Sequence, residues 1–232
     1  MSVISAVMPT YNQDKFIEDA LKSLVHHFDE LVICDDGSTD DTPEILRRWE
    51  GNYKHIKVVT HLTNLGTAEA INTAVDFLSP DYEWLTWCSS DNIYADDWRV
   101  VVDEEIEPDF GAMYTSYLWG LPGDPRSRIE HQNHYPDRLI NQTACYYGPS
   151  FVIRKDIWEA AGKHRGRISH DYDHWLRIEE ACWGAGAEIV FRGDPRTPYV
   201  LYNAHDERVT LTRKDQYDAP HWQAEGRKRR GL

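Results

Sequence analysis

Short apolar runs alternate with amphipathic segments through the first hundred residues. Four runs rich in apolar and β-branched residues predict strands: Val3–Met8, Leu31–Cys34, Ile56–Thr60 and Trp84–Cys88. Apolar residues recur at helical spacing in 14–25 and 67–77, and Pro43 with Glu44 indicates a further helix from about Asp41. Strands that alternate with helices at this interval predict an α/β fold with a doubly wound, mostly parallel sheet.

The second half of the chain has a less regular pattern. It predicts strands at Gly111–Leu118, Ser150–Ile153, Glu188–Phe191 and Pro198–Tyr202, and helices at Lys155–Ala161 and Asp171–Cys182. The segment from Pro122 to Asn141 is polar and indicates a long excursion or a lid. Because no repeat, linker or change of composition interrupts the chain, we expect a single domain over 1–232, with two halves (1–110 and 111–210) and a polar tail (211–232).

Charge and composition exclude some classes of protein. The 25 Lys and Arg residues against 39 Asp and Glu give a net charge of −14, which argues against a general nucleic-acid binder because neutralising phosphates requires surplus cations. No apolar run reaches about 18 residues and the start lacks the features of a signal peptide, so we expect no membrane span and no leader. The four cysteines are scattered, which favours buried free thiols and a cytoplasmic protein.

Conspicuous polar groups follow three of the predicted strands. Thr10-Tyr11-Asn12 comes after the first, Asp35-Asp36-Gly37-Ser38 after the second and Ser90-Asp91-Asn92 after the fourth. Each group alone is typical of a turn or a helix cap. Because ligands of parallel sheets bind beyond the carboxyl ends of the strands, the three together predict a polar, acidic pocket that would accept an anion only with a cation present.

Other local patterns carry weaker signals. No dinucleotide-binding glycine motif, P-loop or serine nucleophile elbow occurs. His170 and His174 have helical spacing but lack the glutamate of the zincin motif, so we expect one to pack and the other to be exposed rather than a zinc site. The basic cluster Arg227–Arg230 favours a disordered terminus over a contact with an anionic membrane or a further domain.

Six segments resemble family-2 glycosyltransferases with the GT-A fold. They run in the order of that family from about Val3 to His205, and the pair PTYN and DDGSTDDT is the most specific part. The segments are VMPTYNQDKFIEDALKSL (7–24), ELVICDDGSTDDTPEIL (30–46), NLGTAEAINTAV (64–75), TWCSSDNIYADDW (86–98), FVIRKDIWEAAG (151–162) and HDYDHWLR (170–177).

The resemblance implies an enzyme that transfers a sugar from a nucleotide sugar, with UDP favoured over GDP or dTDP, to a hydroxyl group of a glycan, lipid or protein. Inversion at the anomeric carbon is the usual outcome in the family. The first half would bind the donor and the second half the acceptor. The resemblance assigns the nucleotide to Pro9, Thr10, Tyr11, Asn12, Asp35, Asp36, Asn64, Gly66, Thr67 and Ser90.

The resemblance also implies a metal ion and a catalytic base. Asp91 matches the last acidic residue of the metal motif, and His205 matches a second ligand of many members. Carboxylate and phosphate oxygens suit Mg²⁺ or Mn²⁺, which would stabilise the diphosphate leaving group, and a histidine ligand would favour Mn²⁺. Asp171 matches the base that removes the proton of the acceptor hydroxyl. The family often has Glu where this chain has His170. Asp173 is a second candidate for the role of base.

Aromatic residues could stack on sugar faces. The candidates are Trp119, Tyr146, Tyr147 and Trp175, although most of the tryptophans are expected in the core. The chain departs from the family pattern in its short length and in the serines at 89 and 90 of the metal motif. Partner domains or weak self-association therefore stay open.

Two other functions are compatible with such a sheet. A sugar-1-phosphate nucleotidylyltransferase would open with a glycine-rich, arginine-containing phosphate loop, which PTYNQD is not. A non-catalytic module that binds sugar nucleotides or glycans is the other alternative. The presence of Asp91, Asp171 and His205 argues against it.

Overall fold

The predicted alternation of strands and helices is present in the computed structural model, which describes residues 2–120, 127–130, 147–166, 170–202 and 219–231. The first part contains β1 (Ile4–Thr10), α1 (Ile17–Leu24), β2 (Glu30–Asp35), α2 (Thr42–Asn52), β3 (Ile56–Thr60), α3 (Thr67–Asp76), β4 (Trp84–Trp87), β5 (Ile93–Tyr94) and α4 (Trp98–Glu105). The second part contains β6 (Phe110–Tyr114), β7 (Tyr117–Trp119), β8 (Arg128–Glu130), β9 (Phe151–Arg154), α6 (Lys155–Ala161), α7 (His170–Ala185), β10 (Glu188–Phe191), β11 (Val200–Tyr202) and α9 (Ala219–Arg230).

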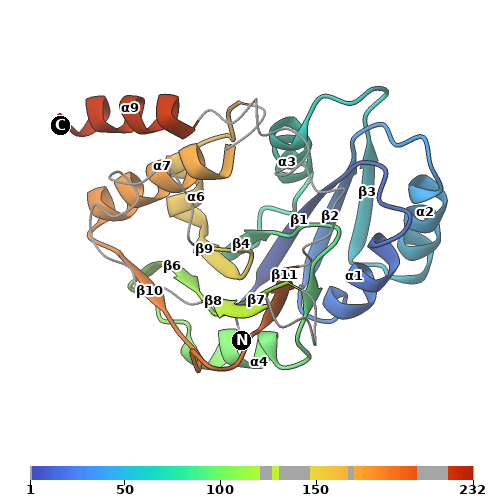
Figure 1. The fold of residues 1–232 in the computed structure, drawn as a ribbon, viewed down its shortest axis with the longest axis horizontal. Coiled ribbons are helices and arrows are strands. Elements are labelled where there is room, and N and C mark those ends of the chain that lie inside the picture. The colour runs from blue at the N-terminus through green and yellow to red at the C-terminus, as the bar shows by residue number, and fades with distance from the viewer. Residues whose placement is uncertain (1, 121–126, 131–146, 167–169, 203–218, 232) are drawn as a thin grey trace.

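A seven-stranded sheet with the order β10-β6-β9-β4-β1-β2-β3 forms the centre of the molecule (Figure 1). β1 pairs in parallel with β2 and β4, β2 with β3, and β10 with β6. β9 runs antiparallel to both of its neighbours, β4 and β6. The predicted α/β fold with a mostly parallel sheet is therefore confirmed, and the antiparallel β9 is an addition that the alternation of elements did not predict.

Successive side chains of the central strands enter two separate apolar cores. In β1, Val7 belongs to the core that contains α3, α6 and α7, whereas Ala6 and Met8 belong to the core that contains α1, α2 and α4. This division follows from the two-residue period of a strand. Because helices cover both faces of the sheet, its strands read as continuous apolar runs in the sequence.

The prediction of one strand at Gly111–Leu118 is wrong, because this run forms two strands in two different sheets. β6 joins the central sheet, and β7 joins a four-stranded sheet of order β5-β11-β7-β8. Thr115 and Ser116 separate the two strands. Thr115 Oγ1 lies 2.5 Å from Ser150 Oγ, and Ser116 Oγ donates to the carbonyl oxygen of Thr197 at 2.5 Å. These buried hydrogen bonds hold the chain where it passes from one sheet to the other.

The polar tail contains helix α9, so the expectation of a disordered terminus at Arg227–Arg230 is wrong. α9 packs against α7. Arg229 Nε lies 2.9 Å from a carboxylate oxygen of Glu180, and Arg230 Nη2 lies 3.0 Å from one of Glu179. Two of the four basic side chains are therefore bound within the fold.

Three cysteines are buried free thiols, as predicted for them: Cys34, Cys88 and Cys182. Cys145 lies outside the described residues. Burial raises the pKa of the Cys88 thiol to about 12, so this side chain acts as a small apolar group of the core rather than as a nucleophile.

Two further expectations concern the polar excursion and membrane-spanning helices. Arg128–Glu130 within the predicted polar excursion forms strand β8, and the rest of the excursion lies outside the described residues, apart from Ser127. Among the helices described, none combines the length and the apolar character that crossing a membrane requires.

Candidate active site

The ends of three neighbouring strands bring together the polar residues that the sequence singled out. Thr10 at the end of β1 pairs with Asp35 at the end of β2, and Val7 of β1 pairs with Trp87 at the end of β4. The segments that follow these strands leave the sheet at one edge, which we call the rim, as expected for parallel strands. Thr10 and Asp35 are buried and Pro9 is half-buried, so the rim is polar but largely shielded from solvent.

Asp36 organises the loop between β3 and α3. Its Oδ1 accepts hydrogen bonds from His61 Nδ1 at 2.7 Å and from the Leu65 amide at 2.9 Å, and its Oδ2 accepts one from the Gly66 amide at 2.7 Å. Because a carboxylate only accepts, Nδ1 of His61 carries a proton, and Nε2 of the same ring lies 2.9 Å from the Thr73 hydroxyl. His61 was not among the predicted site residues, since a histidine after a strand belongs to no motif.

Asp35 and Asn12 shape the turn beside this loop. Asp35 Oδ1 accepts the Ser38 amide at 3.0 Å. The Asn12 amide donates to Ser38 Oγ at 2.9 Å, and Asn12 Oδ1 accepts the Thr39 amide at 2.8 Å. Asn12 has a φ of 52°, a left-handed conformation that asparagine tolerates. Tyr11 is 41% exposed, so its ring is accessible to a ligand at the rim.

Two glycines of these loops adopt backbone conformations that other residues rarely take, and Gly37 also lies at a close approach of the two loops. Gly37 has a φ of +76°, and a Cβ there would lie 2.9 Å from the carbonyl carbon of Thr63. Gly66 has a φ of +100° and directly precedes α3. A side chain at either position would be strained. Asn64 is exposed and Thr67 is half-buried, so the three predicted residues of this segment surround the start of α3.

The segment after β4 carries the predicted metal ligand. Ser90 is buried and Asp91 is half-exposed. Asn92 is only 1% exposed, and neither polar atom of its side-chain amide has a hydrogen-bond partner within the described residues. The same holds for Thr10 Oγ1 at the end of the adjacent strand. Because buried polar atoms are nearly always hydrogen-bonded, these atoms indicate that water or a ligand completes the rim.

The oxygen donors of the rim fit a hard cation. Asp91 supplies a carboxylate, which Mg²⁺ and Mn²⁺ prefer. In the part of the chain that the structure describes, no three His, Cys, Asp or Glu side chains are placed to hold a metal together. The predicted ligand His205 lies outside the described residues.

Asp171 and Asp173 lie two residues apart on α7 in different environments. Asp173 is fully buried and bound by two arginines, with Oδ1 accepting Arg165 Nη2 at 2.5 Å and Oδ2 accepting Arg177 Nη2 at 2.9 Å. Asp171 is half-exposed in the first turn, and its Oδ1 accepts the amide of Tyr172 at 2.9 Å. Asp173 is thus engaged in packing, and Asp171 is the more accessible of the two carboxylates.

Three histidines gather at the start of α7. His164 and His174 are buried with stacked rings whose centroids lie 3.8 Å apart, and His164 Nδ1 lies 3.0 Å from Nδ1 of the half-exposed His170. The ring of Trp87, at the end of β4, meets the His164 and His174 rings edge-on at 4.9 and 5.6 Å. The prediction that one histidine of α7 packs is confirmed by His174, whereas His170, expected to be exposed, is only half-exposed. The first turns of α7 therefore lie beside the strand that leads to Asp91.

Burial makes the stability of this cluster sensitive to acid. It lowers the pKa of His164 and of His174 well below the ordinary 6.5, and the neighbouring charge of Arg177 lowers both further. In the unfolded chain each ring takes up a proton near pH 6.5, whereas in the folded protein it does so only at lower pH. The unfolded state therefore binds more protons just below pH 6.5, so acid favours unfolding.

We expect the free energy of unfolding to be maximal above about pH 6.5 and to fall below it, by up to about 1.4 kcal/mol per pH unit for each of the two histidines. Urea denaturation at pH 7.5, 6.5 and 5.5 measures this slope. His174→Phe keeps an aromatic ring but removes one titrating group, so the slope of the unfolding free energy against pH should fall by up to about 1.4 kcal/mol per pH unit. Equal slopes for the variant and the parent protein would contradict the prediction.

The aromatic residues expected to stack on sugars have different surroundings. Tyr147 and Trp175 are buried and stack on each other with centroids 4.0 Å apart, so this expectation is wrong for both. Trp119 is half-exposed, and the Arg128 guanidinium lies 4.8 Å from the centroid of its ring. Tyr146 lies outside the described residues.

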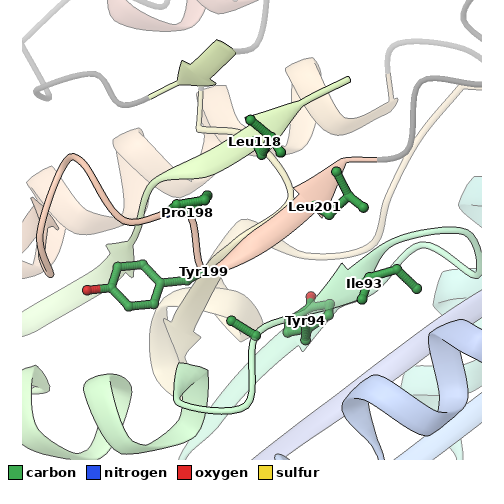
Figure 2. A pocket seen from close by; sticks show the side chains of 7 residues that line it. Ile93, Tyr94, Leu118, Pro198, Tyr199 and Leu201 are labelled. Carbon is green, nitrogen blue, oxygen red and sulfur yellow. The ribbon is translucent and has the colours of Figure 1, made fainter. Parts of the chain in front are cut away.

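Figure 2 shows an apolar pocket of about 150 Å³ on the four-stranded sheet. Its lining consists of Ile93, Tyr94, Ala95, Leu118, Pro198, Tyr199 and Leu201. The Tyr94 hydroxyl is turned into the core, 3.2 Å from the carbonyl oxygen of Pro149. Since none of these described lining residues carries a charge, the pocket suits an apolar group and not a phosphate or a cation.

Known proteins resemble this chain over most of its length. The family described as glycosyl transferase family 2 matches residues 5–159. Chondroitin synthase of Escherichia coli is 25% identical over 206 residues, which cover 77% of this chain and 26% of that protein. The chain therefore spans about a quarter of this relative.

Solved structures share the fold. S. aureus TarS 1–349 in complex with UDP-GlcNAc has a TM-score of 0.70 at 19% identity, covering 97% of this chain and 66% of that one. The mannosyltransferase PcManGT from Pyrobaculum calidifontis in complex with GDP-Man and Mn²⁺ has a TM-score of 0.63 at 19% identity, covering 97% of this chain and 69% of that one. Both share the α/β arrangement of this chain.

Proposed function

Since this chain belongs to glycosyl transferase family 2, we propose that it transfers a sugar from a nucleotide sugar to an acceptor hydroxyl with inversion. A UDP-sugar is the favoured donor, and TarS, which binds UDP-GlcNAc, supports this choice. The observation that carries the proposal is that β1, β2 and β4 end at one edge of the sheet, so that the segments with Asp35, Asp36 and Asp91 leave the sheet there. Thr10 and Asn92, in or after these strands, have buried polar atoms without a partner within the described residues. Membership of this family argues against the two alternatives, a non-catalytic binding module and a nucleotidylyltransferase.

The nucleotide would occupy the two loops that meet at Gly37. The exposed ring of Tyr11 offers a face on which a base can stack. The oxygens of Asp35 and Asp36 retain acceptor capacity beyond their hydrogen bonds to the loops. The remaining residues of this proposed site are Pro9, Thr10, Asn12, Asn64, Gly66, Thr67 and Ser90.

Asp91, with His205, would hold Mn²⁺ or Mg²⁺. When bound, such an ion stabilises the negative charge that develops on the departing diphosphate. The Asp91 carboxylate would hold the ion in the segment that follows β4. The Mn²⁺ in PcManGT supports this part of the proposal.

Asp171 would take the proton of the acceptor hydroxyl. Its helix starts beside the end of β4, as the contacts of Trp87 with His164 and His174 indicate. An acceptor between Asp171 and the donor would attack from the side opposite the diphosphate, which inverts the anomeric configuration. A positioned carboxylate base typically accelerates such a step by about a hundred- to ten-thousandfold.

Asp91→Asn is expected to weaken metal-dependent binding of UDP by at least about tenfold, because the variant loses the charged ligand of the cation. Calorimetric titration with UDP over a series of Mn²⁺ concentrations measures the effect. Asp97→Asn, at an exposed position before α4, serves as the matched control and should bind like the parent protein. Unchanged affinity of Asp91→Asn at every Mn²⁺ concentration would remove Asp91 from the metal site.

The activity itself is tested by a screen of nucleotide sugars for release of UDP, GDP or dTDP in the presence of Mn²⁺. We expect release from at least one UDP-sugar, and faster release when a hydroxyl acceptor is added. Metal-independent binding of UDP without release from any donor would favour the binding module instead.

The organisation of the protein is part of the same proposal. Residues 1–110 would bind the donor and 111–210 the acceptor within a single domain, and further domains or self-association would supply what the longer relatives contain. The free thiols of Cys34, Cys88 and Cys182 support a reducing, cytoplasmic location.

A further inference from the structure

His164 lies where three segments of the proposed site meet. Its backbone is bound by the side chain of Asn72, which is buried in α3: the His164 amide donates to Asn72 Oδ1 at 2.8 Å, and Asn72 Nδ2 donates to the His164 carbonyl at 3.0 Å. These two hydrogen bonds join residues 92 positions apart. They attach the segment before α7 to the helix whose N-terminus carries Gly66 and Thr67.

The ring of His164 makes the other two connections. Its Nδ1 lies 3.0 Å from Nδ1 of His170, the first residue of α7 and the neighbour of Asp171. Its face stacks on His174 one turn later in α7. Its edge contact with Trp87 reaches the end of β4, four residues before Asp91.

The burial of His164 also indicates its tautomer. Nε2 of His164 is buried and has no hydrogen-bond partner within the described residues. A buried N–H without an acceptor is rarer than a buried acceptor without a donor, so the proton of the neutral ring belongs on Nδ1. His164 is then the donor and His170 the acceptor in the bond between the two rings.

We propose that His164, anchored by Asn72, is a positioning residue for the carboxylate of Asp171. By donating from Nδ1 to His170, it holds the first turn of α7 against the end of β4 and the middle of α3. This inference rests on the proposed function, because it assumes that Asp171 is the base. A shift of about 1 Å in such a group can lower a rate by up to about a hundredfold, so the loss of this anchor should be visible in turnover.

The test compares His164→Phe and Asn72→Leu with the parent protein, using the full chain. His164→Phe keeps a ring for stacking but removes the Nδ1 donor. Asn72→Leu keeps the approximate volume and removes both hydrogen bonds. For each variant we expect kcat to fall by at least about tenfold, while KM for the nucleotide sugar stays within about twofold.

Val102→Ala is the control for general loss of stability. Val102 is buried on α4, in the core on the opposite face of the sheet, and should leave kcat unchanged. An equal fall in kcat for Val102→Ala, or normal kcat in both test variants, would overturn the inference.

A second readout does not depend on transfer activity. ¹H–¹⁵N spectra of the imidazole nitrogens report which nitrogen of His170 accepts a hydrogen bond, and we expect its Nδ1 signal to shift in His164→Phe. An unchanged signal would overturn the inference whatever the activity. If the parent protein transferred no sugar while this signal shifted, the bond between the rings would stand and the proposed function would fail.

Discussion

Replacing Asp171 by asparagine is expected to lower the rate of sugar transfer by at least about a hundredfold while leaving nucleotide binding unchanged. Asparagine has nearly the shape of aspartate and its side-chain oxygen can still accept the Tyr172 amide, so the first turn of α7 should persist. What the variant loses is the ability to take up a proton. Initial rates of UDP release with an acceptor, together with calorimetric binding of UDP, measure the two quantities separately.

Thermal unfolding provides the control for Asp171→Asn. Because Asp171 is half-exposed, the melting temperature of the Asp171→Asn variant should stay close to that of the parent protein. Near-normal turnover in this variant would assign the role of base to another group. A fall in UDP affinity equal to the fall in rate would place Asp171 in donor binding instead.

Asp173→Asn, two residues further on, should instead destabilise the fold. We expect the free energy of unfolding to fall by roughly 3 kcal/mol. Asp173 is fully buried between Arg165 and Arg177. Burial already lowers the pKa of Arg177, against the opposing effect of Asp173, so removing the carboxylate leaves a cation without compensation in the interior. Arg165 is 42% exposed and can turn to solvent, which places the expected value at the lower end for a broken buried ion pair.

Urea denaturation at pH 7.5 measures this loss. Glu44→Gln is the matched control, because it breaks the exposed ion pair between Glu44 and Arg47 and should change stability by less than about 0.5 kcal/mol. Similar values for the two variants would mean that the Asp173 cluster does not stabilise the fold. The contrast between Asp171 and Asp173 thus separates a group proposed for chemistry from one that supports its helix.

The periodicity of the chain predicted most of the central fold. β3, α6 and β10 have the bounds that their apolar patterns indicated, because the spacing of apolar residues within each segment is a local property of the sequence. The meeting of Thr10, Asp35 and the segment after β4 at one rim also followed, since parallel strands end at the same edge.

The local pattern of apolar residues did not predict the elements that depend on distant partners. The run of β6 and β7 reads as one strand in the sequence. Its division between two sheets depends on distant strand partners and on hydrogen bonds such as those of Thr115 and Ser116 to Ser150 and Thr197. α9 has no apolar stripe, and ion pairs with Glu179 and Glu180 of α7 attach it to the fold. A local window contains none of these partners.

The site shows the same division. Residue types and motifs were enough to nominate Asp91 and Asp171, because a carboxylate can bind a cation or accept a proton wherever it lies in the sequence. The choice between Asp171 and Asp173, and the parts played by His61 and His164, depend on which groups are buried and which meet across as many as 92 positions of the chain. Burial and long-range contact arise only when the chain has folded, so neither can be read from the order of the residues.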